Sequence, residues 1–257
     1  MRPMLQAIQR MADAIVSAMD GKVRGIWLYG SVVLGDFRPG WSDIDFIALT
    51  DGSISETQAA RLLTLRQTLS EENPGNPYYR SFEGVIADAG EYREKAFTRL
   101  VYWGTSGQRI TDRWEQDAFS ACELAKYGRP VYGADDRSLF PMPGRQALNE
   151  AVRSHAESIR KYARQTDERL YSCGWLLDIA RCMYTLRTGG VIAKTQAGIW
   201  ALEQHLFPDE DQLRKTVEVR SHPLLYKDRE DIRQWLKGLG PVVQRYADVL
   251  EAALASM

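Results

Sequence analysis

Hydrophobic residues along the first half of the chain follow two different periods. Apolar positions recur every three or four residues over 5–19, which predicts an amphipathic helix that ends near Gly21. Short β-branched and aromatic runs predict strands over 25–30, 43–50, 82–87 and, at a sheet edge because of Pro130, 129–133. Helices are predicted over 56–72 and 115–127, while 96–111 fits either a hairpin or an irregular excursion. This alternation predicts an α/β region: a mixed sheet flanked by helices.

The pattern changes after residues 140–144, where two prolines and a glycine mark a boundary. From there only helical periodicity continues, over residues 146–165, 170–187, 195–206, 209–220, 229–238 and 241–255. We therefore predict two domains, an α/β domain over residues 1–143 and an all-α helical bundle over residues 144–257.

Composition narrows the function classes. The 257 residues include 33 Lys and Arg against 34 Asp and Glu, so the net charge of −1 gives no general field for nucleic acid or an anionic membrane. No apolar run is long enough to span a membrane. The three cysteines form no CxxC pair and the three histidines do not cluster, which argues against a disulfide framework or a zinc site and favours a cytoplasmic protein.

The motif with the clearest chemistry joins the first two predicted strands. One strand ends in Gly30-Ser31, a loop follows over 32–42, and the next strand opens with Asp43-x-Asp45. Residues i and i+2 of a strand share a face, so the two carboxylates are expected about 6–7 Å apart. Two ionised carboxylates this close repel each other and therefore need a cation between them. Aspartate oxygens suit Mg²⁺, and Gly30 with Ser31 suits a phosphate.

A third carboxylate is expected from Glu83 on the strand over 82–87. Three carboxylates around Mg²⁺ form a site for nucleotidyl transfer, in which Glu83 takes the proton of the attacking hydroxyl. Two plainer interpretations remain open: the Gly-Ser and Asp-x-Asp pair arises by chance at a turn and a strand start, and Glu83 is an exposed strand residue. Asp88 is a weaker alternative for the base.

These residues resemble the signature of the DNA-polymerase-β-like nucleotidyltransferase superfamily. Gly30-Ser31, the loop, Asp43-x-Asp45 and the spacing to Glu83 are most similar to the aminoglycoside adenylyltransferases of the streptomycin and spectinomycin type. The resemblance extends into the second half, where Arg181 and Lys194 match the family's arginine and lysine that hold the ATP phosphates. Lys194 precedes Thr195, an expected helix N-cap. The competing interpretations are an ion pair between Arg181 and Asp178 and a solvated Lys194.

The resemblance implies Mg²⁺-dependent transfer of AMP from ATP to a hydroxyl of a small, cationic acceptor. An aminoglycoside or aminocyclitol antibiotic such as spectinomycin or streptomycin is the first choice. A lincosamide or a protein hydroxyl is an alternative acceptor, and a non-catalytic nucleotide-sensing module is an alternative function. Tyr162, Tyr171 and Gly174 stand where streptomycin-modifying members carry an aromatic residue and an acid–histidine pair. We expect a monomer or weak dimer that binds neither nucleic acid nor membrane.

Overall fold

The computed structural model describes residues 2–104 and 107–256. Contacts between residues divide the chain into two compact units, one of Met1–Val33 with Asp43–Met142 and one of Leu34–Ser42 with Pro143–Met257. The second unit thus includes a loop from the first half of the sequence. The sequence-based prediction of one boundary between residues 143 and 144 did not include this loop in the second unit.

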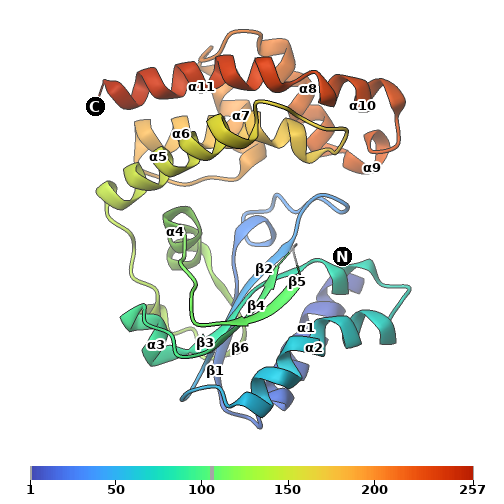
Figure 1. Cartoon of the computed structure of the whole chain (residues 1–257), viewed down its shortest axis with the longest axis vertical. Helices are drawn as coiled ribbons and strands as arrows, with labels where there is room; N and C mark the ends of the chain where they lie inside the picture. Colours follow the sequence, from blue (N-terminus) through green and yellow to red (C-terminus); the bar gives the residue numbers. More distant parts are fainter. Residues whose placement is uncertain (1, 105–106, 257) are drawn as a thin grey trace. The chain divides into compact units, whose positions relative to one another are not determined.

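The first unit contains a six-stranded sheet in the order β5-β4-β3-β2-β1-β6, drawn in Figure 1. Among the described residues, β2 and β3 pair parallel and the other neighbouring strands pair antiparallel, so the sheet is mixed as the sequence predicted. The strands are β1 (Val23–Leu28), β2 (Ile44–Thr50), β3 (Phe82–Asp88), β4 (Leu100–Gly104), β5 (Gly107–Thr111) and β6 (Arg129–Gly133). Within the stretch 96–111, β4 and β5 pair antiparallel, which agrees with the hairpin alternative; residues 105–106 lie outside the described residues. The proline-containing strand β6 lies at the sheet edge.

The described residues of this unit also form α-helices beside the sheet. They are α1 (Arg2–Ala18), α2 (Glu56–Glu72), α3 (Ala89–Glu94) and α4 (Ala118–Tyr127). Helix α2 begins where the sequence predicted, because Ser55 and Gln58 form a reciprocal capping box at its N-terminus. The helices α1 and α2 pack against each other beside the sheet (Figure 1).

Strand alternation gives the two faces of the sheet different roles. On the α2 side, Phe46 and Trp103 stack edge to face with 5.3 Å between ring centroids, and the Trp103 indole donates a 3.0 Å hydrogen bond to the Leu62 carbonyl. Trp103 is fully buried, so it packs in the core and does not line a binding surface. On the other face, Ile47 and Val85 belong to a second buried cluster. Because side chains alternate along a strand, Asp45 and Glu83 share this second face.

The described part of the second unit's long segment consists of helices and the loops that join them. Its helices are α5 (Arg145–Tyr162), α6 (Tyr171–Thr188), α7 (Lys194–Glu203), α8 (Glu210–Ser221), α9 (Pro223–Tyr226), α10 (Glu230–Lys237) and α11 (Gly240–Ala255). The helix α6 contacts α5, α7, α8 and α11, so it forms the centre of the bundle. The short helix α9 was not predicted, because a single turn that begins at Pro223 carries no helical periodicity.

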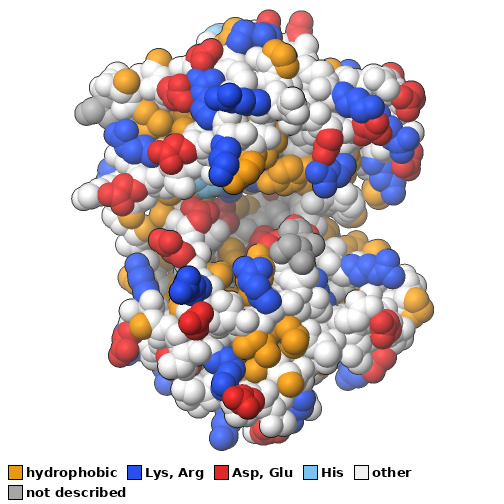
Figure 2. All heavy atoms as spheres, viewed as in Figure 1, with side chains coloured by type: hydrophobic (Ala, Val, Ile, Leu, Met, Phe, Trp, Pro, Cys, Tyr) orange, Lys and Arg blue, Asp and Glu red, His pale blue; other side chains and the backbone are white. Residues whose placement is uncertain are grey.

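Charge and cysteine positions agree with the composition. Acidic and basic side chains are interspersed over each unit on the face drawn in Figure 2. The three cysteines are buried, and none of them forms a disulfide within the described residues. Among the residues that the structure describes, none of the helices combines the length and the apolar character that a membrane crossing requires.

Candidate active site

The turn after β1 brings the backbone and a hydroxyl against the start of β2. Gly30 opens a short 3-10 turn, Gly30–Val32, with a φ of 66°. Residues with a side chain rarely adopt this conformation, and a Cβ here would overlap the Asp45 carboxylate. The Ser31 hydroxyl lies 3.4 Å from the Asp43 backbone carbonyl, to which it donates a hydrogen bond. Glycine at position 30 therefore lets the Asp45 carboxylate lie directly against the turn.

The parallel strands β2 and β3 place two carboxylates side by side. Their register pairs Asp45 with Glu83, so the two side chains leave the same face of the sheet from neighbouring strands. Asp43 immediately precedes Ile44, where β2 begins, so the predicted strand starts one residue later than expected. The structure thus brings together in one unit Gly30, Ser31, Asp43, Asp45 and Glu83.

Tyr102 is a site residue that sequence reasoning missed. Its hydroxyl donates a 2.6 Å hydrogen bond to Oε1 of Glu83. Burial, and then the hydrogen bond to Glu83, raise the pKa of Tyr102 to about 12. The phenol therefore stays protonated at neutral pH and remains a hydrogen-bond donor.

Arg66 is a second residue that sequence reasoning did not single out. From α2 it donates hydrogen bonds of 2.8 Å to the Phe82 carbonyl and 3.0 Å to the Gly104 carbonyl, and so links the ends of β3 and β4. Burial lowers the pKa of Arg66, against the opposing effect of the Glu83 and Asp43 carboxylates. These neighbours place a half-buried cation close to the predicted site.

Asp88, the alternative base, has a structural role. One carboxylate oxygen accepts hydrogen bonds from the backbone N–H groups of Gly90 and Glu91 at the start of α3. The other oxygen accepts a 2.7 Å hydrogen bond from the Gly52 N–H. Because backbone donors engage both oxygens, Asp88 caps a helix and ties down a turn.

The donor chemistry beside the Gly30 turn suits Mg²⁺. This ion usually binds one or two carboxylates together with substrate phosphates and keeps several waters. Asp43 and Asp45 supply oxygen donors of that kind. Within 2–104 and 107–256, no three or more His, Cys, Asp or Glu side chains are arranged to hold a metal ion. The aspartates thus fit a metal shared with phosphate, and the predicted three-carboxylate set with Glu83 stays a prediction.

In the second unit, Arg181 and Lys194 gather around one buried acid. Asp178 is only 6% exposed. Its Oδ1 lies 2.8 Å from the Lys194 ammonium and 3.8 Å from the Arg181 guanidinium. Burial alone would raise the pKa of Asp178, but Lys194 and Arg181 outweigh burial and hold the pKa below its ordinary value. The ion pair with Arg181, one of the competing interpretations, is present, and Lys194 is paired rather than solvated.

The predicted capping of α7 by Thr195 is wrong. The N-cap is Ala193, Lys194 is the first helical residue, and the Ala193 side chain makes no capping hydrogen bond. Instead the Thr195 N–H donates a 3.2 Å hydrogen bond to the Asp36 carboxylate, which comes from the loop 34–42. The orphan donor at the helix start is therefore satisfied from far along the chain.

Asp36 anchors that loop within the second unit. The buried Arg220 guanidinium donates hydrogen bonds to Asp36 at 3.1 Å and to the Thr195 hydroxyl at 3.2 Å. The same guanidinium lies over the Trp41 ring, 5.2 Å from its centroid. Arg38 completes the set at 3.3 Å from the second Asp36 oxygen. The loop between the two halves of the sequence motif is thus held by buried charges.

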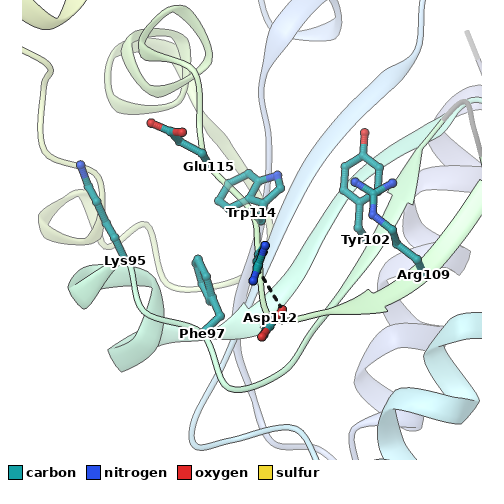
Figure 3. A pocket seen from close by; sticks show the side chains of 8 residues that line it. Lys95, Phe97, Tyr102, Arg109, Asp112, Trp114 and Glu115 are labelled. Atoms are coloured by element: carbon teal, nitrogen blue, oxygen red, sulfur yellow. Dashed lines mark ion pairs between the residues drawn. The ribbon is translucent and has the colours of Figure 1, made fainter.

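A hollow of about 640 Å³ opens beside Tyr102 in the first unit (Figure 3). The Arg109 guanidinium lies over the Tyr102 ring, 4.2 Å from its centroid, and Phe97 packs edge to face against Trp114. The hollow is lined by Lys95, Phe97, Tyr102, Arg109, Asp112, Arg113, Trp114 and Glu115. Tyr102 is the residue that this hollow shares with the surroundings of Glu83.

Comparison with known proteins shows similarity in both sequence and fold. A nucleotidyltransferase domain model matches residues 10–82, and the model of the aminoglycoside adenylyltransferase C-terminal domain matches residues 138–216. The fold is similar to that of the spectinomycin adenyltransferase AAD(9) from Enterococcus faecialis, whose crystal structure contains ATP and spectinomycin. That match has a TM-score of 0.65 and 17% identity, and covers 96% of this chain and 98% of the other.

A toxin–antitoxin structure with AMP-PNP matches at a TM-score of 0.29 and 14% identity, over 59% of this chain and 93% of that one, too weakly to define a common fold. The two domain models instead cover the Gly-Ser and Asp-x-Asp motif in the first unit and the Arg181–Lys194 segment in the second. The chain is therefore a nucleotidyltransferase of the aminoglycoside adenylyltransferase type.

Proposed function

We propose that this enzyme transfers AMP from ATP to a hydroxyl of an aminocyclitol or aminoglycoside antibiotic, with Mg²⁺ as cofactor. The observation that carries the proposal is the register of β2 and β3, which sets Asp45 beside Glu83 next to the Gly30–Ser31 turn. The neighbouring crystal structure with ATP and spectinomycin makes spectinomycin the first acceptor to test.

The residues of the first unit divide the work of this reaction. Gly30 lets the backbone approach a phosphate closely, and Ser31 offers a hydroxyl and an N–H to phosphate oxygens. Asp43 and Asp45 would hold Mg²⁺, which, when bound, neutralises charge on the phosphates. We keep Arg181 and Lys194 as predicted phosphate contacts, a role for which they would have to leave Asp178 or share it.

Glu83 supplies the proton acceptor. As the acceptor hydroxyl attacks the α-phosphorus, its proton passes to Glu83, the new oxygen–phosphorus bond forms, and the bond to the pyrophosphate oxygen breaks. A carboxylate in this position accelerates the transfer by about 10²–10⁴-fold as a general base. Pyrophosphate leaves and the antibiotic carries AMP.

The test is incubation of the protein with MgATP and, separately, spectinomycin, streptomycin and a lincosamide, followed by mass spectrometry for an added AMP. We expect AMP on spectinomycin or streptomycin, and a loss of about 10²–10⁴-fold in Glu83→Gln, which keeps the shape but cannot accept the proton. Asp51→Asn, which changes an exposed acid of the same unit, is the matched control and should retain activity.

Three outcomes would contradict the proposal. AMP on the lincosamide alone would replace the acceptor class. AMP on none of the acceptors, in a preparation that binds MgATP, would refute the antibiotic as substrate. Equal AMP transfer by Glu83→Gln and the wild type would remove Glu83 from the mechanism.

A further inference from the structure

Tyr102 reaches Glu83 across the β3–β4 ladder. Tyr102 pairs with Val85 in the antiparallel register, and Val85 lies two residues beyond Glu83 on the same face of β3. A tyrosine directly opposite Val85 must lean along the strand to meet Glu83, and its hydroxyl lies 2.6 Å from Oε1. The hydrogen bond therefore depends on the direction of the Tyr102 ring as well as on strand pairing.

A glycine provides the space for that direction. A Cβ at Gly104, two residues along β4 from Tyr102, would overlap the tyrosine ring. The position of Gly104 is itself fixed, because Arg66 donates a 3.0 Å hydrogen bond to its carbonyl and a 2.8 Å one to the Phe82 carbonyl. The path of the ring toward Glu83 is thus built into the backbone.

A cation covers one face of the ring. Arg109, the register partner of Tyr102 on β5, places its guanidinium 4.2 Å from the ring centroid. A guanidinium over an aromatic face is attractive and limits rotation of the ring. Tyr102 therefore contacts both Gly104 and Arg109, and its hydroxyl donates to Glu83.

We propose that Tyr102 is a positioning residue that holds Oε1 of Glu83, so that Oε2 takes the proton of the acceptor hydroxyl. The inference rests on the proposed function, and it assigns the orientation of the base to a residue outside the carboxylate motif. The phenol suits this task because it is a neutral donor. A lysine or arginine in its place would compensate the charge of Glu83 and weaken it as a proton acceptor.

The first experiment compares Tyr102→Phe with the matched variant Tyr92→Phe. The Tyr92 hydroxyl donates a 2.7 Å hydrogen bond to Gln116, so its removal costs a similar bond in the same unit. A hydrogen bond to a charged group corresponds to about ten- to one-hundredfold in rate. We expect kcat to fall by about that factor in Tyr102→Phe, while KM for ATP and MgATP affinity by calorimetry stay unchanged. Tyr92→Phe should retain the wild-type kcat.

A second variant retains the tyrosine hydroxyl but changes the direction of the ring. Gly104→Ala puts a methyl group where the Tyr102 ring lies, so the ring must move. We expect a loss of kcat close to that of Tyr102→Phe, and little additional loss when the two substitutions are combined. Thermal unfolding of each variant verifies that the fold persists.

A double-mutant cycle with Glu83→Gln separates positioning from other roles. If Tyr102 acts through Glu83, Tyr102→Phe lowers pyrophosphate release about ten- to one-hundredfold in the wild type and has no further effect in Glu83→Gln. The same additional loss in both backgrounds, or a Tyr102→Phe enzyme with wild-type kcat, overturns the inference and leaves the proposed function intact. Wild-type activity of Glu83→Gln overturns both.

Discussion

Two carboxylates, the partly exposed Glu83 in the sheet unit and the buried Asp178 in the helical unit, have different surroundings. Asp178 lies against the Lys194 ammonium and near the Arg181 guanidinium. Glu83 accepts its hydrogen bond from the neutral phenol of Tyr102. The nearby Arg66 guanidinium donates to two backbone carbonyls. In the helical unit two cations lie directly against the buried carboxylate, whereas in the sheet unit a neutral phenol donates the hydrogen bond and the cation Arg66 donates to the backbone.

The largest effect should come from removing charge in the sheet unit. Asp45→Asn keeps size and removes a metal-binding oxygen's charge, so turnover should fall by about 10²-fold or more and Mg²⁺ affinity should decrease. The free energy of unfolding should change little, because the residue contributes charge rather than packing. Pyrophosphate release, a Mg²⁺ titration and urea unfolding on one preparation measure all three. Near-wild-type turnover would show that Asp45 does not hold the metal.

The buried pair between Arg220 and Asp36 should instead affect the stability of the fold. Arg220→Met leaves the Asp36 carboxylate, which is only 3% exposed, without its buried partner. Breaking such a pair costs about 3–5 kcal/mol in the free energy of unfolding. Urea unfolding measures the loss, and the double variant with Asp36→Asn should recover part of it because no charge is then left buried. A loss below about 1 kcal/mol in the free energy of unfolding would mean that this pair contributes no more than an exposed ion pair.

Lowering the pH should reveal how much Asp178 contributes to the free energy of unfolding. Its pKa is lowered in the folded protein from an ordinary 3.8, because the attraction of Lys194 and Arg181 exceeds the cost of burial. The folded state then binds fewer protons than the unfolded state, so this contribution is complete above pH 3.8 and disappears as the pH falls through the lowered value. The difference in unfolding free energy between wild type and Asp178→Asn should shrink as pH is lowered through this window. A difference that grows toward acid would reverse the sign of the shift.

The smallest effect is expected at an exposed pair. Arg24 and Asp51 lie 2.7 Å apart, with 43% and 54% of their side chains exposed. Such pairs contribute about 0–1 kcal/mol, and salt screens them. Asp51→Asn should therefore change the urea midpoint hardly at all. A loss of stability as large as that of Arg220→Met would mean that burial does not explain the difference between the two ion pairs.

Local patterns predicted those parts of the fold that local forces determine. The helix over 56–72 has its own capping box, and the strands of the motif carry apolar residues in a run that only a buried strand accommodates. Helix α7 differs, because its first turn is satisfied by Asp36, which is 159 positions away from Thr195. A rule that looks for a cap next to the helix therefore chose the wrong residue.

The carboxylates of the predicted site could be chosen from the sequence because their choice also depends on local patterns. Asp43 and Asp45 are separated by one residue, and strand alternation alone puts Glu83 on a definite face. The role of Tyr102 could not be predicted, because its hydrogen bond to Glu83 depends on strand pairing in a stretch that the sequence left undecided. Arg220 meets Asp36 across 184 positions and looks, in sequence, like any other arginine on a helix.

The loop 34–42 has a consequence for any attempt to take the protein apart. The chain leaves the sheet unit after Val33, returns at Asp43 and leaves again after Met142, so the two units are interleaved along the polypeptide. A truncation after Met142 would strip this loop of Arg220 and leave Asp36 and Trp41 in water. A gene cut at that point would yield two interdependent pieces. Co-expression of both fragments, with reassembly as the measured quantity, is the appropriate way to study either one.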